Sequence, residues 1–385
     1  MVGRFLGVEE VAGSNPAGPT LFAEKCFAFQ LARICYYSLP MPHYSKASEI
    51  KVGVVGYGGA FNMGRSHLNQ MKAAGMTPVA ITEVDPTRLA AAKVDFPGIE
   101  TYKSVAAMLK KSSVDLVVLI TPHNTHAPLA LQCLKAGRHV VCEKPLAITT
   151  AEVNAMIAAA KKAGVMLSTY HNRHWDGSIM QAVQLIKKEK IIGDIVRIEC
   201  HMGGYGKPGD WWRTSRRISG GILYDWGVHL LEYSLQLIDS PITEISGFAH
   251  HGHWAPQTVW KADSNEDEGF AVVRFKSGQW LTLCITNLDS KAKEGMLEIT
   301  GTKGTYVIDY DTSRTFVHGE DKRITTTRFQ NPPGQEHRYY ENVRDQLVKG
   351  KALIITAEWS RRPIHILDQA VRSAKLGKTL PAQHA

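Results

Sequence analysis

Residues 50–170 alternate between short apolar runs and stretches with helical periodicity. Apolar runs without polar alternation are typical of strands buried on both faces of a sheet. Strands that alternate with helices of this length form parallel, doubly wound sheets. The sequence therefore predicts an α/β first half with helices on both faces of its sheet. The expected strands are residues 50–55, 78–82, 114–120, 139–142 and 165–170, and the expected helices are residues 64–74, 127–136 and 151–163, with a further helix opening at Pro86.

The second half of the chain has a different pattern, in which polar and apolar residues alternate. Such alternation indicates strands with one face in the core and the other in solvent. We predict an α+β domain with an open, mostly antiparallel sheet. Because an uncovered sheet face usually needs a partner, we expect a homodimer or homotetramer formed through this sheet. The expected strands are residues 195–201, 268–275, 280–286, 295–300 and 305–310, and the expected helices are residues 179–190, 336–349 and 357–376.

Length and composition restrict the class of protein. The 385 residues suggest two domains with an appendage, and we place the boundaries at residues 1–48, 49–170 and 171–385. A content of 44% hydrophobic and 21% charged residues excludes a wholly disordered chain. No apolar run approaches the ~20 residues of a membrane span.

The net charge of +9 lies in short, broken clusters, so we expect no nucleic-acid partner. Scattered cysteines without a C-x-x-C motif are typical of a reduced, cytoplasmic protein.

Residues 1–48 show no clear periodicity and differ from the rest of the chain. Residues 13–16 (Gly-Ser-Asn-Pro) are also the peptide that a reading frame yields from the T-arm end of many transfer RNA genes. We therefore hypothesise that translation begins at Met41, with a genuine disordered extension as the alternative. Charged residues interrupt the moderately apolar segment 21–40 and no cleavage site follows it, so no secretory signal is predicted.

The first expected strand leads into a glycine-rich loop that we expect to hold a dinucleotide. Gly56 permits a tight turn, Gly58 lets the backbone approach a pyrophosphate, and the next helix offers unpaired N–H groups. The third glycine of the usual G-x-G-x-x-G pattern is displaced to Gly64, and a turn without a ligand is the alternative. The loop residues expected at the cofactor are Gly56, Gly58, Gly59, Phe61, Asn62 and Met63.

Glu83, at the end of the second expected strand, favours NAD over NADP. A carboxylate there accepts the ribose hydroxyls of adenosine and repels a 2′-phosphate. Asp85 is a rival for this role, although its place before Pro86 also suits a helix cap. Arg88 could instead compensate a phosphate, which keeps NADP as the alternative.

Further polar residues follow the later strands. In a doubly wound sheet, ligands bind beyond the carboxyl ends of the strands. Lys144 would lie at this edge, where an ammonium can donate to a substrate hydroxyl and stabilise an alkoxide. The alternatives are a surface role for Lys144 and a helix-start role for His126. The cofactor contacts expected here are Thr121, Pro122, Asn124, His126, Glu143 and Lys144.

Asp225 and His229 are four residues apart and share one face of an expected helix. A carboxylate beside an imidazole fixes its tautomer and raises its basicity, as a general base near neutral pH requires. A purely structural hydrogen-bonded pair is the alternative.

Aromatic and basic residues in the second half suit a polyol pocket, because aromatic faces stack on sugar C–H surfaces while Arg and His bind hydroxyls. Core packing is the alternative for the tryptophan. The cluster His250, His251 and His253 lacks a partner at a ligand-like spacing, so no metal site is predicted. The expected substrate contacts are Arg173, His174, Trp212 and Arg213.

Three motifs resemble the glucose–fructose oxidoreductase/inositol dehydrogenase (Gfo/Idh/MocA) family: Thr121–His126 (TPHNTH), Glu143–Pro145 (EKP) and Gly220–His229 (GGILYDWGVH). The resemblance extends from about residue 49 to about residue 380 and departs from the family pattern in the glycine loop and at Ser219. It implies a Rossmann domain that binds NAD(P), then a domain on an open, largely antiparallel sheet through which members often assemble. Members commonly oxidise or reduce sugars, cyclitols and related polyols. At matching positions it implies the catalytic residues Lys144, Asp225 and His229.

We hypothesise hydride transfer from a secondary carbinol carbon to NAD. His229 would remove the hydroxyl proton, Asp225 would orient His229, and Lys144 would hold the developing oxyanion. Two alternatives remain: a redox-neutral, NAD-dependent enzyme that cleaves glycosides through a transient keto-sugar, and a non-catalytic dinucleotide sensor. Net production of NADH separates the dehydrogenase from the redox-neutral enzyme, and the presence of Lys144, Asp225 and His229 argues against a sensor.

Overall fold

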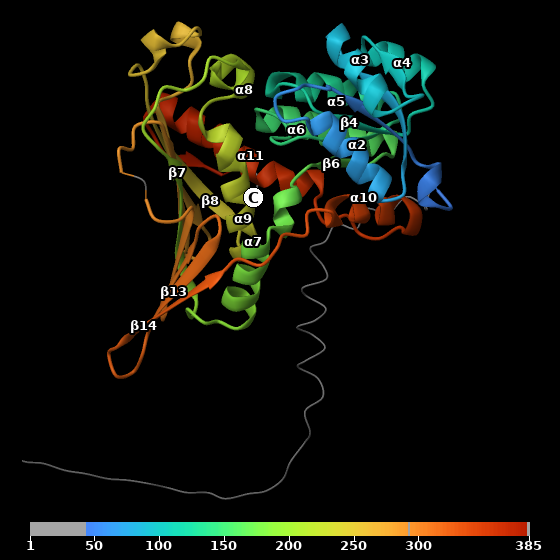
Figure 1. The fold of residues 1–385 in the computed structure, drawn as a ribbon. Coiled ribbons are helices and arrows are strands. Elements are labelled where there is room, and N and C mark those ends of the chain that lie inside the picture. The colour runs from blue at the N-terminus through green and yellow to red at the C-terminus, as the bar shows by residue number, and fades with distance from the viewer. Residues whose placement is uncertain (1–43, 292, 383–385) are drawn as a thin grey trace, which may run out of the picture. The chain divides into compact units, whose positions relative to one another are not determined.

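The computed structural model describes residues 44–291 and 293–382, and the expectations for the start of the chain lie outside this range. These residues form two sheets with helices packed against them (Figure 1). The first sheet is parallel and has the order β3-β2-β1-β4-β5-β6, which confirms the predicted doubly wound half. Its strands are β1 Lys51–Val55, β2 Thr77–Thr82, β3 Glu100–Tyr102, β4 Leu116–Leu119, β5 His139–Cys142 and β6 Leu167–Thr169.

The central strands of the first sheet are buried on both faces, because consecutive apolar side chains point to both sides of the sheet. In β4, Leu116 and Val118 pack into one core cluster, while Val117 and Leu119 pack into another on the opposite face. This double burial explains the continuous apolar runs in the sequence. The helices of this half are α2 Met63–Ala73, α3 Pro86–Asp95, α4 Val105–Lys111, α5 His126–Lys135 and α6 Thr150–Ala163.

The second sheet is mostly antiparallel, as predicted, with β10 and β7 as a parallel pair within it. Its order is β14-β13-β12-β11-β7-β10-β9-β8-β15. The expected strands are present with shifts of a few residues at their ends, but β8, β13, β14 and β15 were not predicted. The strands are β7 Ile195–Gly203, β8 Ile242–His250, β9 Glu268–Phe275, β10 Trp280–Thr286, β11 Leu297–Gly301, β12 Gly304–Ile308, β13 Thr312–His318, β14 Ile324–Gln330 and β15 Leu380–Pro381.

Helices cover one face of the second sheet and connect it to the first. Helix α11 (Ala357–Leu376) packs against α6, against α9 (Leu223–Leu237) and against β8. Along β10, Leu281, Leu283 and Ile285 are buried, whereas the alternate residues are more exposed. The remaining helices are α7 Gly177–Ala182, which continues as the π-helical segment Val183–Lys188, α8 Arg216–Ser219 and α10 Arg338–Lys349. None of the helices in the described part of the chain has the length and apolar character of a membrane span.

Helix α10 comes late in the sequence but contributes to the core of the first sheet. Tyr339 and Tyr340 are buried there; the Tyr339 hydroxyl hydrogen-bonds Ser168, and that of Tyr340 hydrogen-bonds His67. The edge of the first sheet therefore receives side chains from both halves of the chain.

The strand order reverses between β1 and β4, which is where doubly wound sheets bind their ligands. Gly56 follows β1 and Ile120 follows β4, and a Cβ atom on Gly56 would lie 2.3 Å from the carbonyl oxygen of Ile120. Gly56 also has a φ of +99°, which favours glycine. The close approach of the two strand ends thus requires the first glycine of the loop.

Candidate active site

The glycine loop and the start of α2 form an open cradle that fits a pyrophosphate. Space lies open around Gly59, and only the Arg88 side chain approaches the position of a Cβ atom on Gly58. Asn62, the residue before α2, makes no side-chain hydrogen bond to the helix, so the first N–H groups of α2 remain available. Gly64 packs so closely on Tyr57 that a Cβ atom would lie 2.7 Å from its ring. The displaced third glycine therefore still joins helix and strand closely, as the motif requires.

The tip of the glycine loop contacts the second half of the chain. Phe61 is 60% exposed, and its ring centroid lies 5.8 Å from that of Trp211. The guanidinium of Arg213 lies over three rings, at 5.2 Å from the centroid of Phe61, 4.8 Å from that of Trp211 and 4.5 Å from that of Trp212. These contacts hold Arg213 beside the loop that is expected to carry the cofactor.

Glu83 lies at the end of β2, as expected, but its carboxylate is buried. It accepts hydrogen bonds from the backbone N–H groups of Tyr57 at 2.7 Å, Val84 at 2.7 Å and Asp85 at 3.1 Å. A carboxylate has about four acceptor positions, so one remains for a ribose hydroxyl. Asp85 caps α3 through the N–H of Thr87, which agrees with the helix-cap reading.

The segment after β4 is held by its own hydrogen bonds. The Thr125 hydroxyl donates to Thr121 Oγ1 and the carbonyl of Pro122, whereas Asn124 is exposed. His126 is fully buried, with Nδ1 2.7 Å from the carbonyl oxygen of Pro145 and Nε2 2.8 Å from that of Thr121. Neither ring nitrogen of His126 is free for a ribose. His126 therefore has the alternative role, at the start of helix α5.

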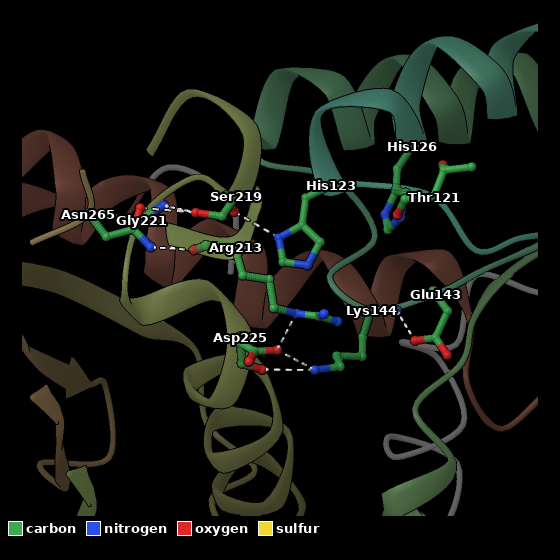
Figure 2. Close-up of polar contacts among 10 residues, drawn as sticks. All are labelled: Thr121, His123, His126, Glu143, Lys144, Arg213, Ser219, Gly221, Asp225 and Asn265. Carbon is green, nitrogen blue, oxygen red and sulfur yellow. Dashed lines mark hydrogen bonds and ion pairs between the residues drawn. The ribbon is translucent and has the colours of Figure 1, made fainter. Parts of the chain in front are cut away.

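Lys144, which follows β5, meets Asp225 of α9 between the two halves of the chain (Figure 2). We call this place the crevice, because doubly wound sheets bind their ligands in a crevice at this edge. The Lys144 ammonium lies 2.8 Å from Asp225 Oδ1 and 3.1 Å from the carbonyl oxygen of Asp225, so two of its three N–H groups are directed at Asp225. Arg213 Nε lies 3.5 Å from the same Oδ1. Burial raises the pKa of Asp225, but the positive charges of Lys144 and Arg213 outweigh it, and the pKa is lowered. Asp225 is therefore ionised and holds both cations in place.

Glu143 fixes the backbone at Lys144. Its carboxylate accepts the Lys144 N–H at 3.0 Å and lies 3.0 Å from Nε2 of His67, whose other ring nitrogen contacts the Tyr340 hydroxyl. The peptide bond between Lys144 and Pro145 is cis. Glu143 is thus a support for Lys144 within this network.

His229 lies one turn after Asp225 on α9, but the expected orientation by Asp225 is wrong. The Asp225 carboxylate is paired with Lys144 and Arg213, and Nδ1 of His229 is buried without a hydrogen-bond partner. Burial lowers the pKa of His229 well below its ordinary value, and Lys144 and the neighbouring His171 lower it further. The imidazole is therefore neutral, and its basicity is reduced rather than raised.

The four expected substrate residues lie in different surroundings. Arg213 and Trp212 border the crevice, where the Trp212 ring packs against His123 at 4.8 Å. Arg173 lies over Trp226 at 5.2 Å and pairs with Asp176 at 3.1 Å. His174 Nδ1 lies 2.5 Å from the buried carboxylate of Glu232, which also accepts a hydrogen bond from Trp359. His174 is therefore occupied by Glu232.

Two buried histidines at the crevice were not among the predicted site residues. The N–H at Nδ1 of His123 donates to the carbonyl of Ser219 at 2.8 Å, while its Nε2 has no partner (Figure 2). Both ring nitrogens of His171 are buried without partners. His123 and His171 follow the ends of β4 and β6, and this position was the one sequence signal that they belong to the site. The spacing of residues does not reveal where a ring points.

Within the described residues, no group of three or more His, Cys, Asp or Glu side chains is placed to hold a metal ion. In the histidine cluster, His250 Nδ1 lies 3.4 Å from Asp267.

Comparisons with known proteins find relatives that match both halves of the chain. The sequence model of the oxidoreductase family with an NAD-binding Rossmann fold matches residues 50–171, and that of the GFO/IDH/MocA C-terminal domain matches residues 179–307. The scyllo-inositol 2-dehydrogenase (NADP(+)) of Bacillus subtilis is 26% identical over 88% of this chain and 98% of its own. The myo-inositol 2-dehydrogenase of Thermotoga maritima is 28% identical over 78% of this chain and 85% of its own.

A solved structure has the same fold over most of the chain. The NAD-binding protein from Listeria innocua superimposes with a TM-score of 0.73 and 26% identity, covering 86% of this chain and 96% of that protein. The two family matches together span more than half of the sequence. Lys144 lies in the first match and Asp225 in the second. The chain therefore belongs to the Gfo/Idh/MocA family of NAD-binding oxidoreductases.

Proposed function

We propose that the protein is an NAD-dependent dehydrogenase that oxidises a secondary alcohol of a sugar, cyclitol or related polyol. One observation carries the proposal: the ammonium of Lys144 is fixed by Asp225 in the same crevice as the neutral imidazole of His229. The crevice lies at the edge of the first sheet, where the glycine-loop cradle fits a dinucleotide. Bound NAD supplies the hydride acceptor.

Lys144 holds the oxygen atom that changes charge. Two of its N–H groups are directed at Asp225, and the third is free to donate to a substrate hydroxyl. As the C–H bond breaks, negative charge develops on that oxygen, and a fixed cation stabilises it. Asp225 acts by positioning Lys144, in place of its expected role on His229.

His229 takes the hydroxyl proton. In the balanced reaction, R₂CHOH and NAD⁺ give R₂C=O, NADH and H⁺, so a base must accept one proton. Burial keeps His229 neutral and able to accept it. The same burial and the charge of Lys144 favour release of the proton afterwards.

The substrate class rests on the crevice lining and on the relatives. The guanidinium of Arg213 lies over the ring of Trp212 at 4.5 Å, and this pairing of an aromatic and a cationic group suits the C–H surface and the hydroxyls of a polyol. The Bacillus subtilis and Thermotoga maritima relatives are both named as inositol dehydrogenases. These features support a cyclic polyol over an acyclic alcohol.

We propose NAD rather than NADP as the preferred cofactor, because the carboxylates of Glu83 and Asp85 lie at the end of β2. Arg88 is the residue that could accept a 2′-phosphate, but its Nε lies 3.6 Å from Asp85, which partly neutralises its charge. The expected kcat/KM with NAD exceeds that with NADP by about tenfold or more, since like charges oppose the phosphate. A preference for NADP that is lost in Arg88→Ala would contradict this assignment.

Residues 49–170 are proposed as the cofactor domain, and residues 171–385 as the substrate and oligomerisation domain, with α10 packing back onto the first sheet. The free cysteines among the described residues, Cys133, Cys142, Cys200 and Cys284, suit the reducing cytoplasm.

The second sheet is the proposed surface for a homodimer or homotetramer. Its face opposite the helices carries Phe248, which is 59% exposed, beside Phe270, with the exposed Trp280 on the next strand. Light scattering coupled to size-exclusion chromatography is expected to give a dimer or tetramer, and Phe248→Glu is expected to shift it toward the monomer. A monomeric wild-type protein at micromolar concentration would refute this part of the proposal.

The function is tested by assaying NADH absorbance with purified protein, NAD and a panel of inositols, sugars and glycosides. We expect stoichiometric NADH with at least one cyclic polyol, formed about 10³-fold more slowly by Lys144→Met. Cleavage of a glycoside without net NADH would instead indicate the redox-neutral enzyme. NAD binding without turnover of any compound would favour a dinucleotide sensor.

A further inference from the structure

His171 is a buried imidazole whose two ring nitrogens both lack a hydrogen-bond partner. It lies two residues after β6 and is only 1% exposed. Its backbone is fixed on both sides, because its N–H donates to the carbonyl of Thr169 at 2.7 Å and its own carbonyl accepts from His174 at 3.1 Å. The backbone position from which the ring extends is therefore fixed.

Such a ring is expected to find partners. A neutral imidazole has one N–H donor and one acceptor nitrogen, and buried polar atoms in native proteins are nearly always matched by protein, water or ligand. Burial lowers the pKa of His171 to about 4, so the ring is neutral at physiological pH. The nearby carboxylate of Glu232 is already taken by His174, Gln236 and Trp359.

His171 adjoins the proposed catalytic base. Its ring centroid lies 6.4 Å from that of His229, with the two rings nearly perpendicular at 82°. Nδ1 of His229 is also without a partner, as is the buried hydroxyl of Thr169 at the end of β6. Unpaired polar atoms of His171 and His229 thus lie in neighbouring rings, beside the point where the substrate hydroxyl is expected.

We propose that His171 binds a second hydroxyl group of the substrate, on the carbon next to the one that is oxidised, and so selects vicinal polyols. A hydroxyl both donates and accepts, as a neutral imidazole does. Two imidazoles with centres 6.4 Å apart can each contact one of two neighbouring hydroxyls, since a ring nitrogen reaches a hydroxyl oxygen at about 2.8 Å. The inference rests on the proposed function and specifies which part of a polyol the site recognises.

A water molecule bridging His171 and His229 is the competing explanation. It would satisfy the same nitrogens but would not distinguish a polyol from its deoxy analogue. The test therefore changes the protein and the substrate together.

The experiment compares wild type, His171→Leu and His171→Gln on the polyol oxidised by the wild type and on its analogue that lacks the hydroxyl next to the oxidised carbon. Leu keeps similar bulk without polar atoms, and Gln keeps one donor and one acceptor. We expect the wild type to prefer the polyol by about 10- to 100-fold in kcat/KM, because the analogue leaves a buried polar group unpaired. His171→Leu is expected to lose this preference through a fall in kcat/KM for the polyol alone, and His171→Gln to regain part of it.

Two results would overturn the inference while leaving the proposed function intact. Equal losses on polyol and analogue in His171→Leu would assign the ring to a structural water, and an unchanged preference would remove it from the site. If His171→Leu does not fold, His171→Asn, whose shorter amide reaches less far, must show the same loss of preference. A wild-type protein that oxidises no polyol would overturn the proposed function, and this inference with it.

Discussion

Two neighbouring groups of polar side chains at the crevice are satisfied in opposite ways. The first group, called the charged side, is Lys144, Asp225 and Arg213, in which each member has an opposite charge within 3.5 Å. The second group, called the imidazole side, is His171 and His229, which are neutral and carry buried nitrogens without partners. The charged side is thus organised by the chain itself, whereas the imidazole side leaves ring nitrogens for a ligand or a water molecule to satisfy.

The charge of Lys144 also affects the pKa values of the two histidines. Burial is the main reason that both histidines have lowered pKa values, and the positive charge of Lys144 adds to it. A fixed cation beside a neutral base is the arrangement that alcohol oxidation needs, because one stabilises the oxygen while the other takes its proton. The difference between the two sides therefore supports the proposed function.

Removing the cation should have the largest effect. Lys144→Met leaves no group to stabilise the developing oxyanion, and kcat is expected to fall by about 10³-fold, near the upper range for one such donor. The steady-state rate of NADH formation measures it. The matched control is Lys190→Met, because Lys190 forms an exposed ion pair with Asp194 and its loss should leave kcat nearly unchanged. A Lys144→Met enzyme within tenfold of wild type would show that the charged side is structural.

Removing the base should come next. His229→Gln is expected to lower kcat by about 10²-fold, the usual contribution of a general base. Because the pKa of His229 is lowered in the folded protein, the base form persists below its ordinary value of 6.5. The acid limb of kcat/KM against pH should thus lie below pH 6.5 in the wild type and disappear in His229→Gln. An acid limb above pH 7 would contradict a neutral, buried base.

The neutral side should also make the fold sensitive to acid. The pKa of His171 falls from 6.5 to about 4 on folding, so between these values the unfolded chain binds a proton that the folded chain does not. Stability is therefore complete above pH 6.5 and is lost as the pH falls. Linkage gives about 2 kcal/mol from His171 between pH 7.5 and pH 5. The free energy of unfolding is measured with urea at pH 7.5 and at pH 5. The loss of stability between these two pH values should be about 2 kcal/mol smaller in His171→Leu than in the wild type. An equal loss in both proteins would mean that the ring is not buried as described.

The smallest effect is expected from Arg213. At 3.5 Å from Asp225 it is the weaker of the two cations, and Lys144 still holds the carboxylate when it is removed. Arg213→Gln is expected to reduce kcat/KM by about tenfold, which corresponds to about 1.4 kcal/mol. A loss as large as that of Lys144→Met would show that Arg213 contacts the reacting oxygen itself.

The charged side could largely be predicted from the sequence, and the imidazole side could not. Lys144 follows a buried strand, and the topology of a doubly wound sheet brings it to the ligand edge. The spacing of Asp225 and His229 correctly placed both on one helix, but it could not show that Lys144, distant in sequence, takes the carboxylate first. Whether the buried rings of His171 and His126 have hydrogen-bond partners likewise depends on how the loops pack, which the sequence pattern does not show.

The same limit applies to the fold. In β4, which is buried on both faces, and in β10, which is buried on one, the apolar residues left a clear pattern. In β14 nearly all side chains are exposed, so no hydrophobic period marks the strand. It was missed because its pairing with β13 is made by backbone hydrogen bonds, which any sequence can form.

Single-turnover oxidation of a polyol that carries deuterium on the reacting carbon tests the central claim most directly. We predict that one deuterium appears in the reduced nicotinamide for each ketone formed, with a rate that falls both with deuteration and in Lys144→Met. Formation of product without deuterium in the nicotinamide, or without net NADH, would contradict hydride transfer at this crevice.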